Sequence, residues 1–141
     1  MTKEFELRKY NMLCAELLGY VNKTLDDKVF NIHEHPITKH MIETNFTNVF
    51  KEDWNWIMMV KNTIVDLDLS FDSKSYRFYF SQYACKKYHA DKEYKYKTRI
   101  YTDFKTLEFK TESNNEKEAV VLAIWEFLNW YNDNKNYDKR I

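Results

Sequence analysis

The chain has 141 residues, the usual length of one domain, and we predict a single domain over residues 1–141. Its 22 basic and 22 acidic residues balance, so no overall field selects nucleic acid or an anionic membrane. One glycine and one proline exclude glycine-rich phosphate loops, dinucleotide-binding fingerprints and nucleophile elbows, each of which needs several glycines.

The first predicted element is a helix over residues 3–18. Gly19 follows it, at the place where a helix commonly ends with a residue in the left-handed conformation. The apolar stripe of this helix is expected to contain Phe5, Met12, Leu13 and Leu17. A short strand is expected near residues 28–32.

A second helix is predicted over residues 53–64, with Asp53 as its cap. Its broad apolar face consists of Trp54, Ile57, Met58, Val60 and Ile64. Because Trp54 and Trp56 differ by ~200° around a helix, they cannot share a face. We expect Trp56 to be the one at the edge of the core.

Strands are predicted between the second helix and the last, because side chains there alternate with period two. The clearest strands are SYRFYFSQY, residues 75–83, and YKYKTRIYT, residues 94–102. The second of these is expected to place Tyr94, Tyr96, Thr98 and Ile100 opposite Lys95, Lys97, Arg99 and Tyr101. Further strands are predicted at residues 65–71, 84–89 and 106–110.

The last predicted helix covers residues 115–133 and includes the run EAVVLAIWEFLNWYND. Ser113, just before the helix, and Glu116, three residues later, have the spacing of a capping box. One helical face is formed by Val120, Ile124, Phe127, Leu128 and Tyr131. Trp125 and Trp130 flank this face, so we interpret the aromatic run as core packing and not as a ligand site.

Together these elements predict an α+β fold, in which an antiparallel sheet of about four strands packs with three helices. The expected order along the chain is α, a short β, α, a β-meander and α. Cys14 and Cys85 are too few for a disulfide framework, so we expect two free thiols and a reducing cytoplasm. The charged start MTKEFELRKYNMLC and the lack of ~18 consecutive apolar residues predict neither a secretory signal nor a membrane segment.

Two groups of side chains are candidates for a metal site. The first contains His33, Glu34, His35 and His40, but its spacing matches neither CxxC nor HExxH, and we interpret it as a polar loop. The second contains Asp66, Asp68 and Asp72, which share one face of a predicted strand and leave open a metal-dependent nuclease. A solvated strand face has the same pattern, and we predict no bound metal and no cofactor.

A catalytic nucleophile is not supported either. Cys85 and His89 lie close in sequence, but nothing identifies an orienting group or an oxyanion hole beside them. We therefore predict no catalytic residue and a non-enzymatic protein.

The basic middle of the chain is the strongest candidate for a binding site. Residues 74–110 carry 10 basic and 4 acidic side chains, net +6; residues 1–73 carry 8 and 12, net −4, and residues 111–141 carry 4 and 6, net −2. Cations and planar rings alternate in this part, which suits phosphates and unpaired bases or an acidic protein surface. The predicted partner-binding residues are Lys86, Lys87, Lys92, Tyr94, Lys95, Tyr96, Lys97 and Arg99.

Three stretches carry a family resemblance: LCAELLGY at 13–20, DWNWIMMV at 53–60 and EAVVLAIWEFLNWYND at 118–133. In this order they resemble short proteins of bacteriophages and their hosts with the phage alpha-beta-alpha sandwich domain. Members of that family often have a D-W-x-W-L-M-type helix and end in an E-F-x-x-W-Y-N helix. These motifs are structural, so the resemblance implies origin more than mechanism.

The resemblance implies a small protein that acts in the bacterial host cytoplasm by binding host machinery. The predicted function is an inhibitor of bacterial antiviral defence, of anti-CRISPR type, that binds a CRISPR effector or interferes with its guide RNA. Two alternatives stay open: the metal-dependent nuclease, and a protein that sequesters a small signalling nucleotide by stacking tyrosines on its base.

Overall fold

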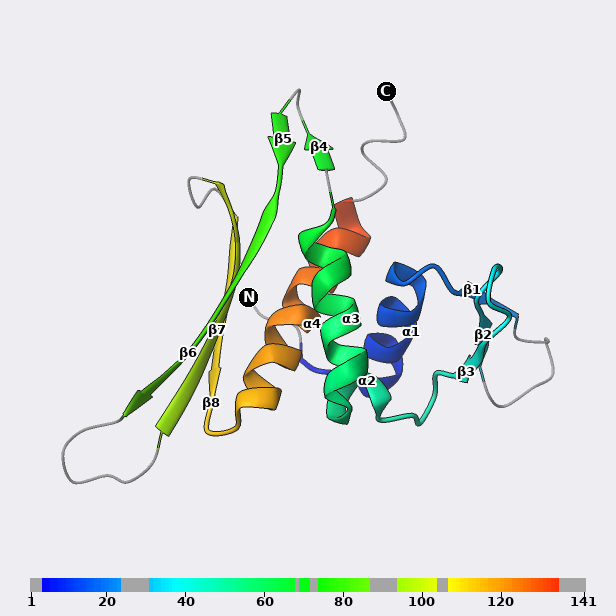
Figure 1. Ribbon diagram of the computed structural model, residues 1–141, viewed down its shortest axis with the longest axis horizontal. Coiled ribbons are helices and arrows are strands. Elements are labelled where there is room, and N and C mark those ends of the chain that lie inside the picture. Colours follow the sequence, from blue (N-terminus) through cyan, green and yellow to red (C-terminus); the bar gives the residue numbers. More distant parts are fainter. Residues whose placement is uncertain are drawn as a thin grey trace. The chain divides into compact units, whose positions relative to one another are not determined.

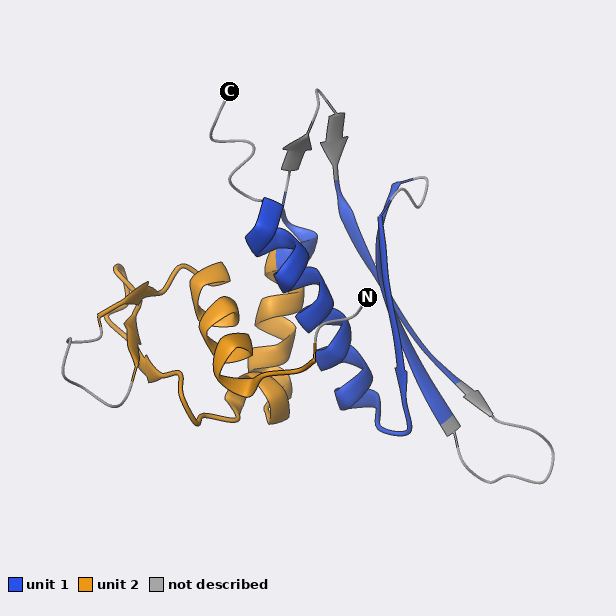
Figure 2. Ribbon diagram, turned by 180° about the vertical axis from the view of Figure 1, so that it is seen from behind, with its two compact units in different colours: residues 1–3, 64–141 blue, residues 4–63 orange. Residues whose placement is uncertain are grey.

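The computed structural model describes residues 4–23, 31–67, 69–71, 74–86, 94–103 and 107–134. Contacts divide the chain, for which a single domain is predicted, into two compact units (Figure 2): residues 4–63, and the described residues from 64 onward. Over the described ranges there are four helices and two three-stranded antiparallel sheets, which confirms the α+β class. None of these helices is long and apolar enough to cross a membrane.

In the first unit, helix α1 is followed by a small sheet. The helix spans Leu7–Leu17, and the sheet contains β1 (Val21–Asn22), β2 (Ile32–Glu34) and β3 (Met41–Glu43), paired in that order. Gly19, at φ 95°, ends the helix in the predicted left-handed conformation. The amides of Gly19 and Tyr20 donate to the carbonyl oxygens of Glu16 and Ala15, the two bonds of a Schellman motif. One short strand was expected near residues 28–32, and the structure has three strands in this part of the chain. Residues 28–30 of the expected strand lie outside the described residues.

The buried face of α1 contains polar groups that the apolar spacing did not predict. Tyr10 Oη donates to the carbonyl oxygen of Phe50 at 2.8 Å, and Asn11 Nδ2 donates to that of Thr47, also at 2.8 Å. These bonds join α1 to the segment around α2 (Val49–Glu52), a short helix absent from the prediction. Met12 and Leu17 are only half-buried, because the helix turns the face of Tyr10, Leu13 and Cys14 inward.

Helix α3 spans Trp54–Val65, close to the predicted range. Asp53 Oδ1 accepts a hydrogen bond from the amide of Asn55 at 2.9 Å, which confirms the predicted cap. The buried side chains of this helix include Ile57, Val60 and Ile64, all of which belong to the predicted apolar face.

The two tryptophans of α3 differ from the prediction. Trp54 is 37% exposed, whereas Trp56 is half-buried. The ring of Trp56 packs edge-on to Phe50 and lies beside His40, with centroid separations of 5.4 and 5.7 Å. The expectation that Trp56 lies at the edge of the core is therefore wrong, because neighbouring rings hold Trp56 and leave Trp54 at the surface.

The second unit is a three-stranded antiparallel sheet with a helix along one face (Figure 1). The sheet contains β6 (Phe78–Lys86), β7 (Tyr94–Thr102) and β8 (Glu108–Ser113) in that order, and the helix is α4 (Glu116–Asn134). A separate hairpin precedes it, formed by β4 (Leu69–Phe71) and β5 (Lys74–Tyr76). β7 and α4 follow the prediction closely.

Four strand predictions need correction. The strand predicted over residues 75–83 is divided, because β5 ends at Tyr76 and β6 begins at Phe78. Residues 84–86 continue β6 and do not form a separate strand, because they keep pairing with β7 in an unbroken register. β8 begins at Glu108 and not at residue 106. Val65 is the last residue of α3, so β4 is shorter than the predicted strand over residues 65–71.

Helix α4 packs an aromatic core against the sheet. The ring of Phe127 lies 4.9 Å from that of Phe78 and 5.9 Å from that of Phe109, both edge-on. Trp125 is 1% exposed, and Trp130 is half-buried with its ring 5.9 Å from Phe78. The aromatic run is thus core, as predicted.

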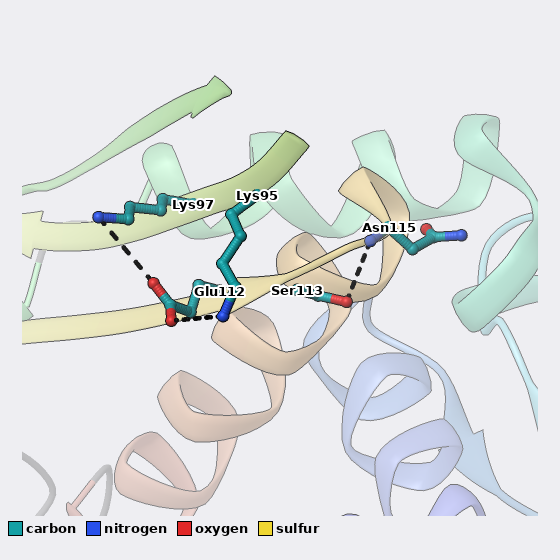
Figure 3. Close-up of polar contacts among 5 residues, drawn as sticks. All are labelled: Lys95, Lys97, Glu112, Ser113 and Asn115. Carbon is teal, nitrogen blue, oxygen red and sulfur yellow. Dashed lines mark hydrogen bonds and ion pairs between the residues drawn. The ribbon is translucent and has the colours of Figure 1, made fainter. Parts of the chain in front are cut away.

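The start of α4 is capped differently from the prediction. Asn115 Oδ1 accepts from the amide of Glu118 at 3.0 Å, so Asn115 and not Ser113 caps the helix. Ser113 Oγ instead accepts from the amide of Asn115 at 3.1 Å (Figure 3) and donates to the carboxylate of Glu118. The predicted cap is therefore two residues too early. Ser113 contributes to the turn before the helix, and Asn115 is the cap itself.

We predict that Leu128→Ala lowers the free energy of unfolding by about 2–5 kcal/mol, through lost apolar burial and the cavity that remains. Leu128 is 2% exposed, whereas Leu122 on the same helix is half-buried and provides the matched control. Urea denaturation measures both variants. A loss below about 0.5 kcal/mol at Leu128, the range of ordinary surface changes, would contradict this packing.

Candidate functional site

The central strand β7 separates its side chains onto two different faces. Thr98, Ile100 and Thr102 are buried on the face that α4 covers. Period-two alternation sends the side chains between them to the opposite side of the sheet, which we call the outer face. Its described residues are Tyr79, Ser81, Tyr83, Lys95, Lys97, Arg99, Tyr101, Glu108, Lys110 and Glu112.

The cations of β7 form ion pairs with carboxylates of β8. Lys95 Nζ and Lys97 Nζ lie 3.4 and 3.9 Å from the two carboxylate oxygens of Glu112, and both side chains point toward it in Figure 3. Arg99 Nη2 donates to Glu108 Oε2 at 2.7 Å. These groups are partly exposed, so such pairs contribute little to stability.

Charge on the outer face is nevertheless positive. Its described residues on β7 and β8 include the cations Lys95, Lys97, Arg99 and Lys110 against the carboxylates Glu108 and Glu112. Among the described residues, Lys110 has no carboxylate within ion-pair distance. The face therefore has cationic capacity left over after its own pairs are formed.

Tyrosines from two strands lie among these cations. Tyr79 and Tyr101 are directly opposite in the register, and their rings stack with centroids 5.7 Å apart. The guanidinium carbon of Arg99 lies 4.7 Å from the centroid of Tyr101, a cation–π contact. Tyr79 and Tyr83 are each 40% exposed, so both present ring surface to solvent.

Neighbouring groups shift the pKa values of two outer-face side chains. The hydrogen bond that the Tyr79 phenol donates to the Asp103 carboxylate is the main cause that raises the pKa of this phenol. The hydrogen bond to Glu108 raises the pKa of Arg99, and the phenols of Tyr101 and Tyr83 raise it further. Both shifts favour the protonated forms, so Arg99 is a cation and Tyr79 a neutral phenol at physiological pH.

The structure brings only part of the predicted binding set together. Lys95, Lys97 and Arg99 share the outer face, whereas Tyr96 belongs to the face that α4 covers. Lys86 and Tyr94 lie at the paired ends of β6 and β7, but their side chains are outside the described residues. Lys87 and Lys92 lie outside them altogether.

The predicted binding set lacks several outer-face residues, among them Tyr79, Tyr83 and Lys110. Each belongs to a strand that period two had located. Joining the predicted strands by an antiparallel hairpin and following one face across it would have found them. Sequence proximity instead favoured Tyr96, which alternation turns away from the neighbouring lysines.

The three histidines of the polar segment have separate roles in the first unit. His35 Nδ1 accepts from the amides of Ile37 and Thr38, each at 3.2 Å. His40 Nδ1 lies 2.8 Å from Tyr20 Oη. His33 is buried on β2, with Nδ1 3.2 Å from Thr44 Oγ1. Over the described ranges, no three residues of metal-binding type come together.

Of the three aspartate candidates, the structure describes only Asp66. Asp66 is exposed in the turn after α3 and not on a strand, because the helix extends further than predicted. Asp68, Asp72 and His89 lie outside the described residues, as does the side chain of Cys85. Cys14 is a buried free thiol, and burial raises its pKa far above the ordinary value.

Comparisons with models of protein families, with curated proteins and with solved structures found no match to this chain. The resemblance to phage proteins therefore stays a prediction from the sequence motifs.

Buried His33 predicts a pH dependence of stability. Thr44 Oγ1 donates its proton to the carbonyl oxygen of Asn31, so His33 Nδ1 is the donor toward Thr44. His33 Nε2 then carries a lone pair and has no hydrogen-bond partner within the described residues. Burial lowers the pKa of His33, and the nearby charge of Glu16 opposes this shift only in part.

Because the folded state binds the proton less well than the unfolded state, stability is fully present above about pH 6.5 and falls as the pH drops toward the folded-state pKa. We predict that the free-energy advantage of wild type over His33→Gln shrinks between pH 7.5 and 5.5. Urea unfolding at several pH values measures it. An advantage that stays constant, or grows on acidification, would contradict a neutral buried His33.

Proposed function

We propose that this chain is a non-enzymatic binding protein that acts as an inhibitor of bacterial antiviral defence. Its outer face would dock on a CRISPR effector or on the guide RNA that the effector carries. The observation that supports a binding role is the gathering of cations and exposed tyrosines on one face of β6, β7 and β8. The choice of partner rests on the resemblance to phage proteins.

The outer face is suited to reversible association. Its ion pairs have N···O distances of 2.7 to 3.9 Å and are partly exposed: the side chain of Glu112 is 49% and that of Glu108 32% exposed. Such pairs are weak, so a partner bearing phosphates or carboxylates can replace Glu108 and Glu112 at modest cost. The tyrosines contribute flat surface with little conformational entropy to lose, as in many binding interfaces.

The ion pairs determine which substitutions test this proposal cleanly. Reversing Lys97 or Arg99 to Glu would place carboxylates beside Glu112 and Glu108, and like charges on adjacent strands destabilise a sheet. Glutamine removes the positive charge and keeps a polar side chain of similar length. Arg8 and Lys51, exposed on helices of the first unit, allow a matched double substitution elsewhere.

We predict that Lys97→Gln with Arg99→Gln weakens binding to a guide-loaded CRISPR effector about tenfold or more, since removing an interface hot spot costs more than about 1 kcal/mol. Arg8→Gln with Lys51→Gln should bind like wild type. Biolayer interferometry with a panel of purified, guide-loaded effectors measures this. Plaque counts of a targeted phage on CRISPR-immune cells that express each variant give the matching functional readout.

Two results would count against the proposal in different ways. If wild type binds no effector and restores no plaques, a CRISPR effector is not the target. If wild type binds but the outer-face double variant binds equally well, the docking surface lies elsewhere on the chain.

A further inference from the structure

We propose that the outer face binds a single-stranded nucleic acid, with bases stacked on Tyr79 and Tyr83 and a phosphate held at Arg99. This inference rests on the proposed function for the choice of face and adds the class of ligand. It follows from three features: the positions of the exposed rings, the group that lies between them, and the carboxylates that occupy the cations.

The exposed rings occupy one strand at a regular spacing. Tyr79, Ser81 and Tyr83 alternate on the outer side of β6, so the two tyrosines are about 13 Å apart along it. Each is 40% exposed. Tyr79 is supported from behind by its stack on Tyr101, and Tyr83 has no ring partner among the described residues. Both therefore offer ring surface to unpaired bases of an extended strand, although at this spacing the two bases are not adjacent ones.

Arg99, on the neighbouring strand β7, is level with the gap between these rings. Ser81 is the register partner of Arg99, and its small side chain separates the two tyrosines. The guanidinium of Arg99 is oriented by Tyr101 on one side and Glu108 on the other. A guanidinium held in this way suits a phosphate, because its planar donors match two phosphate oxygens. A strand whose bases stack on both rings would therefore have its backbone level with Arg99.

Glu108 and Glu112 compete with a ligand for the cations of β7. Glu108 already engages Nη2 of Arg99, so a phosphate competes with Glu108 for that donor, and it competes with Glu112 for Lys95 and Lys97. This competition limits the affinity for a polyanion that has no bases. Base stacking then favours unpaired nucleic acid over such a polyanion. Removing the carboxylate at residue 108 should consequently strengthen binding.

Other occupants of this face are less well matched. An acidic protein would use the cations but has no specific need for two exposed rings that flank one of them. Double-stranded nucleic acid keeps its bases paired and stacked, so the tyrosines would have no base faces to contact. Both alternatives appear as separate outcomes of the test below.

The test uses fluorescence anisotropy of the full chain with three labelled probes: oligouridylate, oligodeoxythymidylate of the same length, and a heparin oligosaccharide that has charge but no bases. We expect Tyr79→Leu with Tyr83→Leu to weaken oligouridylate binding about tenfold or more, because stacking on both rings is lost. Tyr79→Phe with Tyr83→Phe retains the rings and should bind oligouridylate nearly like wild type. None of these four substitutions should change heparin binding.

Two further variants test the role of Arg99. Glu108→Gln should raise oligouridylate affinity about threefold or more, because the phosphate no longer displaces a carboxylate. Arg99→Gln should lower the slope of log affinity against log salt by about 0.7, the value for one phosphate contact on a single strand. Equal binding of oligouridylate and oligodeoxythymidylate identifies the ligand as single-stranded nucleic acid in general, whereas a preference for oligouridylate identifies RNA.

Several results would overturn this inference. If the Phe double variant loses as much oligouridylate affinity as the Leu double variant, stacking is excluded. If wild type binds heparin as tightly as oligouridylate, and neither double variant changes oligouridylate binding, the face is purely ionic. Wild type that binds no oligonucleotide, but binds a guide-free effector protein through Lys97 and Arg99, would refute the nucleic-acid ligand and leave the proposed function standing. Wild type that binds neither would refute both.

Discussion

The two-sided central strand β7 is the constraint on which the unit from residue 64 onward depends. Its buried side chains, Thr98, Ile100 and Thr102, must face α4, because the aromatic core formed by Phe78 and Phe127 lies there. A shift in register by one residue would turn Arg99 and its neighbours toward that core and expose Ile100. The apolar contacts of α4 therefore fix the outer face indirectly, since they leave the cations only one side of the sheet.

The outer face is cationic although the chain has no net charge, and ion pairs with the neighbouring strand hold its cations in place. Glu108 and Glu112 on the adjacent strand form ion pairs with three cations of β7. These pairs organise the cations without neutralising all of them, because Lys110 has no such partner within the described part of the chain. The face is thus preorganised for a ligand with its own negative charges, and its background affinity for other polyanions is held down.

Much of this architecture was predictable from local patterns in the sequence. Period-two alternation located β7 and assigned its two sides, and helical spacing located α4 with its buried tryptophan and phenylalanine. The cross-strand partners were not predictable in the same way, because they depend on which residues of distant segments become opposite one another. The stack of Tyr79 on Tyr101 and the pairing of Lys95 with Glu112 belong to this second kind. The buried polar groups of the first unit, such as Tyr10, follow from individual hydrogen bonds that no periodicity encodes.

The most direct measurement of the central claim is a titration of the isotope-labelled chain with oligouridylate, followed by amide chemical shifts in two-dimensional NMR spectra. The account predicts that the largest shift changes lie in β6 and β7, from Tyr79 to Tyr83 and from Lys97 to Tyr101, with smaller changes in β8. Shift changes confined to residues 4–63, or the absence of any change at saturating oligonucleotide, would contradict it.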